Sequence, residues 1–284
     1  MIKVRKDLAA NYRAIFHDGK TIRMRIDPNK PILTPRSAEI EDVAINSKCF
    51  ANCSYCYTSA TKHGTNFDNL FEKIYDVWAS KEENDRPFQI AIGGAGEPTL
   101  HPNFSEFVKQ VRLTKIMPNY TTNGMHLTGK ILHATEEWCG GVAVSYHPHI
   151  KNVFSEAIHK LNGRTKLNAH VIVGNKESFY DLQSIYETFK DDLSYIVVLP
   201  YQAAGRGVPV ETHDTWKQTF EWIDSLSSER QEQFAFGALF YPWLLENKVP
   251  LKLDIYEPEI YSGYRIMDDT YKILRKSSYN LEPK

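Results

Sequence analysis

The sequence has no hydrophobic run long enough to cross a bilayer, which takes about 20 apolar residues. Its longest apolar run, residues 234–245, is shorter than this and is interrupted by Gly237 and Pro242. The basic residues at the start are not followed by an apolar stretch, so they do not form a secretory signal. We therefore expect a cytoplasmic protein without a membrane partner.

The sequence also lacks an excess of charge of either sign. It has 34 Lys and Arg residues against 35 Asp and Glu residues, a formal net charge of -1. A chain this close to neutral has no overall field that would attract nucleic acid or an anionic membrane. The composition therefore gives no indication of a nucleic-acid partner.

Cysteine is scarce, with only four among the 284 residues. Cys49, Cys53 and Cys56 fall within one short segment, and Cys139 stands alone. This distribution does not suit a disulfide framework, which needs pairs spread along a secreted chain. Neighbouring thiols in a reducing compartment indicate metal binding instead.

From about residue 41, short apolar runs alternate with longer stretches of helical periodicity. This alternation predicts an α/β fold in which parallel strands with helical crossovers curl into a partial (β/α)6 barrel. The expected strands are 42–46, 88–92, 116–121, 141–145, 166–173 and 195–199. The expected helices are 67–81, 103–113, 129–134, 151–161 and 178–190.

We expect three parts along the chain. Residues 1–40 form an N-terminal extension with a hairpin that turns at Asp18 and Gly19. Residues 41–205 form the barrel, and residues 206–284 form a C-terminal extension that covers it. Within this extension we expect a helix near 214–226, core packing by the aromatic run 234–245 and a strand pair across 251–267.

The cysteine triplet follows the first expected strand with the spacing Cys49-x-x-x-Cys53-x-x-Cys56. Thiolates are soft ligands that suit zinc or iron–sulfur clusters, and three of them can hold three corners of a cubane. The fourth iron would then remain open to a cofactor or substrate. Zinc is the alternative, with His63 as a possible fourth ligand, although no second pair of cysteines is present.

This spacing, with the aromatic Tyr55 just before the third cysteine, resembles the signature of the radical S-adenosylmethionine (SAM) superfamily. The resemblance covers about residues 41–205. It implies a [4Fe-4S] cluster on Cys49, Cys53 and Cys56, and SAM bound to the open iron. It also implies reductive cleavage of SAM to a 5′-deoxyadenosyl radical, which abstracts hydrogen from a substrate. The electron would come from an external one-electron reductant such as flavodoxin or ferredoxin.

Further motifs of the same family follow the later strands in order. The segment from Gly93 to Pro98 resembles the motif that binds the SAM amino group. The resemblance extends to a Thr-Asn-Gly element, to a serine that contacts the ribose or carboxylate, and to an isoleucine and a strand end that frame adenine. On this basis the residues expected to bind SAM are Tyr55, Ala95, Gly96, Glu97, Thr122, Asn123, Ser145, Ile172 and Leu199.

The substrate is less well defined by the sequence. His147, Tyr201 and Arg206 are candidate contacts, because each lies in a loop after a strand, and Arg206 could pair with a carboxylate or phosphate. Weaker candidates in the same loops are Lys48, His101, Tyr120, His149 and Gln202.

Three functions remain open at this level. The first is a radical reaction on a nucleotide or small metabolite. The second is hydrogen abstraction from a peptide or glycyl-radical partner, and the third is a non-catalytic zinc module. Cys139 precedes the fourth strand and therefore lies at the amino end of the barrel, away from the other thiols. We accordingly expect a single cluster.

Overall fold

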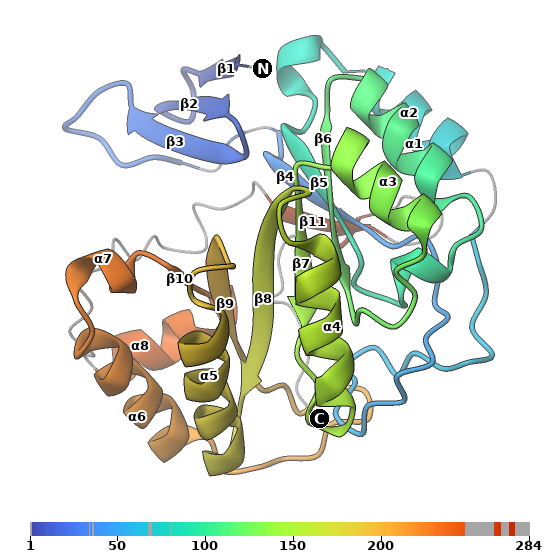
Figure 1. Ribbon diagram of the computed structural model, residues 1–284. Helices are drawn as coiled ribbons and strands as arrows, with labels where there is room; N and C mark the ends of the chain where they lie inside the picture. Colours follow the sequence, from blue (N-terminus) through green and yellow to red (C-terminus); the bar gives the residue numbers. More distant parts are fainter. Residues whose placement is uncertain are drawn as a thin grey trace.

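The computed structural model describes residues 2–33, 35, 37–67, 70–79, 81–247, 264–267 and 273–275. Its main body is one large, mostly parallel sheet with helices along its outer side, and a small antiparallel sheet lies beside it (Figure 1). Among the described helices, none is both long enough and apolar enough to span a bilayer.

The large sheet has nine strands in the order β10-β9-β8-β7-β6-β5-β4-β11-β12. Neighbouring strands are parallel from β10 to β11, and β12 is antiparallel to β11. The strands are β4 (Ile40–Val43), β5 (Gln89–Ile92), β6 (Met117–Thr122), β7 (Gly141–Ser145), β8 (Lys166–Val173), β9 (Tyr195–Pro200), β10 (Phe234–Phe236), β11 (Tyr264–Met267) and β12 (Ile273–Arg275). The predicted partial parallel barrel is confirmed. Strands β10 and β11 extend it beyond both edges of the six predicted strands.

Helices connect these strands, as the sequence predicts. They are α1 (Leu70–Ala79), α2 (Phe104–Leu113), α3 (Gly129–Trp138), α4 (Lys151–Leu161) and α5 (Lys176–Phe189). In α2 the buried residues Phe104, Phe107, Val108 and Val111 recur at the spacing of one helical face. Helix α5 begins where Asn175 accepts a hydrogen bond from the Ser178 backbone in a capping box. These apolar faces build the main core between the helices and the sheet.

Strand β8 illustrates how the sheet separates the core from the site. Its residues alternate between partly exposed and fully buried along the whole strand. Because successive side chains of a strand point to opposite faces, Val171 and Val173 enter the core under the helices. His170 and Ile172 point to the opposite face, inside the curve of the sheet, where the cavity described below lies.

The small sheet is formed by β1 (Ile2–Asp7), β2 (Tyr12–His17) and β3 (Lys20–Arg25), paired antiparallel in that order. The expected turn is present, and both of its residues have left-handed backbone angles, with φ of 48° at Asp18 and 75° at Gly19. Strand β1 was not predicted, and its pattern is unusual, because the polar Arg5 and Asp7 are buried while the apolar Ile2 and Val4 are exposed. A second buried cluster that includes Tyr12, Phe16 and Phe88 joins this sheet to the large one.

The chain after β9 forms α6 (His213–Asp224), α7 (Ser228–Gln231), β10, a 3-10 turn at Ala238–Phe240 and α8 (Tyr241–Asn247). The expected helix near 214–226 corresponds to α6. The aromatic run packs as predicted, since Phe240 and Leu244 are buried in the main core. It also supplies β10, which was not predicted. Of the strand pair expected across 251–267, residues 251–263 lie outside the described part of the chain.

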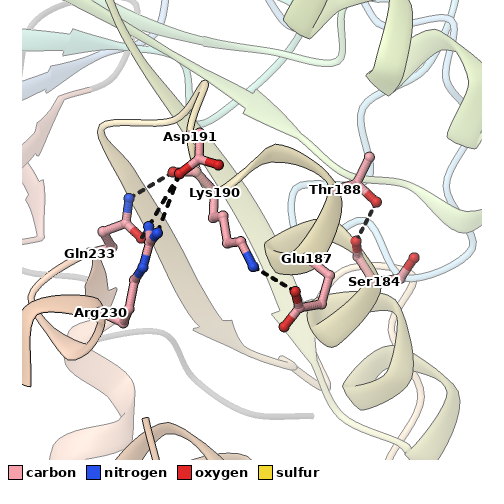
Figure 2. Close-up of polar contacts among 7 residues, drawn as sticks. All are labelled: Ser184, Glu187, Thr188, Lys190, Asp191, Arg230 and Gln233. Carbon is pink, nitrogen blue, oxygen red and sulfur yellow. Dashed lines mark hydrogen bonds and ion pairs between the residues drawn. The ribbon is translucent and has the colours of Figure 1, made fainter. Parts of the chain in front are cut away.

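Surface contacts link this C-terminal part to α5 (Figure 2). Arg230 lies 3.4 Å from the Asp191 carboxylate, and Lys190 lies 2.7 Å from Glu187. Such exposed ion pairs contribute little to stability. The amide of Gln233 donates to the Lys190 carbonyl at 2.7 Å, and Ile196 donates to the Gln233 carbonyl at 2.8 Å. These two bonds bring the chain into register for β10 to pair with β9.

Candidate functional site

A cavity of about 370 Å³ opens at the carboxyl ends of the parallel strands. The loops that follow β4, β5, β6, β7 and β9 line it together with two residues of β8, which is the position where α/β sheets bind ligands. The structure brings to this one cavity Cys49, Cys53 and Cys56 and every residue expected to bind SAM, namely Tyr55, Ala95, Gly96, Glu97, Thr122, Asn123, Ser145, Ile172 and Leu199.

The cysteine loop after β4 folds back on itself. Isolated bridges join Asn46 to Asn66 and Lys48 to Thr61. The Cys49 backbone N–H donates to the Thr61 carbonyl at 2.9 Å. At Gly64 a Cβ atom would lie only 2.2 Å from the Ser47 carbonyl oxygen, so only glycine fits there. The loop that carries the thiols is therefore closed by its own backbone contacts.

Each thiol has a polar neighbour of its own. The Asn123 amide donates to Cys49 Sγ at 3.6 Å, and His147 Nδ1 lies 3.5 Å from Cys53 Sγ. Cys56 Sγ lies 3.4 Å from Thr58 Oγ1. Burial raises the pKa of Cys49, and it raises the pKa of Cys53 to about 11, with the two neighbouring thiols adding to the effect. Metal binding would therefore displace protons from these thiols.

The donor set fits an iron–sulfur cubane. All three cysteines are free, and they come from one loop at the wall of one cavity. Across the described residues, no three His, Cys, Asp or Glu side chains converge on a point that could hold a single ion. A cubane takes protein ligands on separate irons, and this loop supplies three thiols. His63, the alternative zinc ligand, is exposed outside the cavity.

The loop after β5 packs directly on the cysteine loop. A Cβ atom at Gly96 would lie 2.5 Å from Asn46 Oδ1 and 2.6 Å from the Lys48 carbonyl, so the contact requires glycine. The Glu97 backbone N–H donates to the Lys48 carbonyl, and the Asn46 amide donates to the Glu97 carbonyl, both at 2.8 Å. The Gly-Gly-Ala-Gly-Glu segment is therefore held against the thiols.

The Glu97 carboxylate joins this loop to the loop after β6. It accepts hydrogen bonds from the hydroxyls of Thr99 (2.6 Å) and Thr122 (2.7 Å) and from the backbone N–H of Asn123 (2.7 Å). The Thr99 backbone N–H donates to it at 3.3 Å. Burial raises the pKa of Glu97, although these hydrogen bonds oppose the rise.

Asn123, one of the residues expected to bind SAM, makes two side-chain contacts within the protein. Its Oδ1 accepts from the Met125 backbone N–H at 2.9 Å, which is a turn contact, while its amide reaches Cys49. Gly124 has φ of 83° and packs against Ala157, so the turn requires glycine. Turn formation and the contact with the thiol are thus combined in one side chain.

Two of the three expected substrate residues line the cavity, and the third does not. His147 Nδ1 lies 2.9 Å from the Tyr55 hydroxyl, and burial lowers the pKa of His147 to about 4, with His149 adding to the effect. The Tyr201 hydroxyl donates to the Val208 carbonyl at 2.9 Å. Arg206 lies outside the cavity lining and contacts the back of the cysteine loop instead.

Among the weaker candidates for substrate contact, too, only some line the cavity. Gln202 lines the cavity. The Nε2–H of His149 donates to the Ala51 carbonyl at 2.7 Å and so supports the cysteine loop. His101 is buried next to the Phe67 carbonyl, and the Tyr120 hydroxyl is buried next to Thr135. Lys48 lies over the ring of Phe50.

Sequence reasoning missed parts of the cavity wall. His170 lines it beside Ile172, and burial lowers the pKa of His170 to about 4. The alternation along β8 was a signal for this, because residues 170 and 172 share one face. Gly237, Ala238 and Leu239 also line the cavity, and they come from the aromatic run. No local signal placed them there, since β10 reaches the sheet by non-local pairing.

No family model matches the chain. A curated relative is the tungsten-containing aldehyde ferredoxin oxidoreductase cofactor-modifying protein of Pyrococcus furiosus, which is 33% identical over 95 residues. The match covers 33% of this chain and 26% of that protein. The aligned part is therefore about a quarter of the relative's length.

Solved structures of radical SAM enzymes share the fold. SuiB of Streptococcus suis matches with a TM-score of 0.68 at 10% identity, over 94% of this chain and 79% of SuiB. SuiB bound to S-adenosylmethionine matches with a TM-score of 0.61 at 13% identity, over 82% of this chain and 59% of that one. anSMEcpe with bound AdoMet and the Kp18Cys peptide matches with a TM-score of 0.52 at 17% identity, over 72% of this chain and 67% of that one. The fold that the motifs led us to expect is thus confirmed, and the chain has the fold of the radical SAM enzymes.

Proposed function

We propose that this protein is a radical SAM enzyme with a single [4Fe-4S] cluster on Cys49, Cys53 and Cys56 and with SAM beside it in the cavity. One observation carries the proposal. Three free thiols from one loop share a cavity with the side chains and glycine backbone of all the SAM-type motifs. Residues separated by up to about 150 positions in the sequence meet there because parallel strands end at the same edge of the sheet.

When bound, the cluster would supply the electron that cleaves SAM to methionine and a 5′-deoxyadenosyl radical, which abstracts hydrogen from the substrate. The chain positions the groups around it. Asn123 and His147 lie against two of the thiols and orient them. The short contacts of Gly96 leave the Ala95 and Gly96 backbone close to the cysteine loop, where its carbonyls can accept from the SAM ammonium.

In this proposal each of the remaining residues contacts a different part of SAM. Glu97 offers a buried negative charge to the ammonium, and Thr122 and Asn123 flank it. Ser145 presents a hydroxyl to the ribose or carboxylate, while Ile172 and Leu199 supply apolar surface for adenine. Tyr55 is fixed by its bond to His147 and forms part of the wall. The buried setting keeps water away from the reacting carbon.

The substrate in this proposal is a small molecule or a peptide, held near His147 and Tyr201. A nucleotide or metabolite was the first expectation from the sequence. Similar structures that contain a bound peptide, SuiB with the precursor peptide SuiA and anSMEcpe with the Kp18Cys peptide, support the peptide alternative equally. The proposal further includes a cytoplasmic location, a barrel from 41 to 205 flanked by extensions, and an external reductant such as flavodoxin or ferredoxin.

Anaerobic reconstitution with iron and sulfide tests the proposal. We expect a brown protein that, once reduced by dithionite, converts SAM to 5′-deoxyadenosine. The same reduced protein is then incubated with metabolite pools and, separately, with peptide pools, and the pool that accelerates deoxyadenosine formation contains the substrate class. A colourless protein that retains zinc and cleaves no SAM would support the zinc module instead.

A further inference from the structure

The loop between β9 and α6 contains the segment Ala203-Ala-Gly-Arg-Gly207, and Arg206 makes three hydrogen bonds to the cysteine loop from it. Its Nε donates to the Cys53 carbonyl at 2.9 Å, and its Nη1 donates to the Ala60 carbonyl at 2.8 Å. Its backbone N–H donates to the Cys56 carbonyl at 2.9 Å. The backbone of two of the three cysteines is therefore bonded to one arginine.

The preceding glycine allows this close approach. Gly205 has φ of 58°, in the left-handed region, and a Cβ atom there would lie 2.4 Å from the carbonyl oxygens of Cys56 and Tyr57. Any other residue would push the two loops apart. The segment is thus fitted to the cysteine loop both by steric contact and by hydrogen bonding.

The guanidinium is suited to this arrangement. It is planar and permanently charged, and its donors point in fixed directions, so one side chain can bond two carbonyls that lie apart. The carbonyls of Cys53 and Ala60 stand on either side of Cys56 in the sequence. Bonding both fixes the shape of the stretch between them. A lysine ammonium is a single point on a flexible stem and would not fix both carbonyls in the same way.

We propose that Arg206 is a positioning residue for the iron–sulfur cluster, because it holds Cys53 and Cys56 in the geometry that binds the cubane and does not contact the substrate. This inference rests on the proposed function. It also links two parts of the site, since the same loop brings Tyr201 and Gln202 to the cavity wall. A permanent positive charge next to the cluster ligands would in addition raise the reduction potential of the cluster.

The test compares reconstituted wild-type protein with the Arg206→Gln and Arg206→Lys variants. Iron release to a strong ferrous chelator is followed in the anaerobic protein, together with the EPR spectrum and midpoint potential of the cluster. We expect Arg206→Gln to release iron about tenfold faster, the scale on which groups that orient metal ligands act. Its EPR spectrum should change and its potential should fall. Arg206→Lys should release iron faster than wild type but keep a potential close to it, since the charge remains.

Arg230→Gln is the matched control, because Arg230 forms an exposed ion pair with Asp191 and should change none of these readouts. A general loss of stability would lower the melting temperature without altering the EPR spectrum of the intact fraction. If Arg206→Gln does not fold, iron release and the EPR spectrum of Arg206→Lys test the proposal. Wild-type iron release and EPR spectra in the Arg206 variants would overturn the proposal, and so would loss of substrate-stimulated turnover alone. If the wild-type chain assembles no cubane, the proposed function fails and this inference fails with it.

Discussion

Two glutamates are buried to the same extent at opposite ends of the parallel sheet, and each is 3% exposed. Glu39 lies just before β4 at the amino end. It accepts two hydrogen bonds from the Arg23 guanidinium, at 2.6 Å and 3.0 Å, and one from the Tyr12 hydroxyl. Glu97 follows β5 at the carboxyl end and accepts only from hydroxyl and backbone N–H groups.

The difference reflects what each end of the sheet does. A buried charge is costly unless it is paired, and at the amino end Arg23 provides the pair within the protein. For Glu97, no Lys, Arg or His ion pair is formed by any residue that the structure describes. Its negative charge is instead available to a cationic ligand group. Glu39 is therefore paired within the protein, whereas the charge of Glu97 would be completed by the SAM ammonium in the function proposed above.

The largest expected difference is between the three cysteines at the carboxyl end of the sheet and Cys139 at its amino end. Changing Cys49, Cys53 or Cys56 to Ala should abolish the cluster and SAM cleavage, because a cubane needs at least three protein ligands here. Cys139 is buried in the main core before β7, and Cys139→Ser should keep about four iron atoms per chain and full cleavage. Iron analysis and deoxyadenosine formation check both. Iron near eight per chain, or cluster loss in Cys139→Ser, would contradict the single-cluster assignment.

Replacing Glu97 or Glu39 with glutamine should have different effects, on SAM binding at Glu97 and on folding stability at Glu39. Glu97→Gln should weaken SAM binding about tenfold or more, the value of one hydrogen bond to a charged group, with little change in iron content. The Thr99 and Thr122 hydroxyls can reverse to accept from the new amide, so the loops should stay in place. Equilibrium binding of SAM to the reconstituted protein measures the effect.

Glu39→Gln is the counterpart at the amino end. It should lower the free energy of unfolding by about 3 kcal/mol, because the neutral amide no longer balances the Arg23 charge 2.6 Å away, while SAM affinity stays the same. Denaturant unfolding and SAM binding are measured on both variants. If Glu97→Gln binds SAM like wild type, the proposed difference between the two ends does not hold.

Acid should destabilise the protein through His170. The folded pKa of about 4 lies below the ordinary value of 6.5, so the unfolded chain binds more protons between these values. Protonation of this group therefore does not affect stability above pH 6.5. The free energy of unfolding then falls as the pH is lowered from 6.5 toward 4. In His170→Gln this part of the pH dependence should disappear. His133→Gln is the control, since His133 is 77% exposed. If the free energy of unfolding depends on pH in the same way in wild type and His170→Gln, His170 does not cause this loss of stability in acid.

The smallest expected effect concerns Ser145 at the end of β7. Replacing it with Ala removes one neutral hydrogen bond to the cofactor, worth about 1 kcal/mol, so SAM affinity should fall about fivefold. Ser184→Ala, at an exposed position of α5 outside the cavity lining (Figure 2), is the control and should have no effect. An unchanged affinity in Ser145→Ala would mean that the alignment of the β7 motif is shifted.

The sequence predicted the elements whose pattern is local. Strands β7 and β8 and helix α4 have the expected bounds, because their apolar periodicity is complete within each segment. Strand β10 was missed, and the parallel pairing of β11 with β4 was not foreseen although a strand was expected there, since such short strands are recognisable only by the neighbour with which they pair. The SAM motifs were found because they follow strands of a parallel sheet, whose ends meet.

Individual partners in the site were less predictable. The sequence placed Arg206 after the last predicted strand, where a substrate contact was expected, but its partners are carbonyls about 150 residues away. Backbone carbonyls carry no sequence signal, so this role was invisible. Glu97 was expected to contact only the cofactor, and its four protein donors depend on how the β5 and β6 loops cross. Such contacts follow from the packing of loops and not from a motif.

The way in which the cysteine loop closes on itself has a consequence for how the protein matures. The bridges between Asn46 and Asn66 and between Lys48 and Thr61 use only backbone and glycine contacts, and none of them involves a thiol. The chain can therefore complete its loop before it receives any iron, unlike small domains that fold only around their metal. The proposed cluster would then be inserted into a loop whose backbone is already closed.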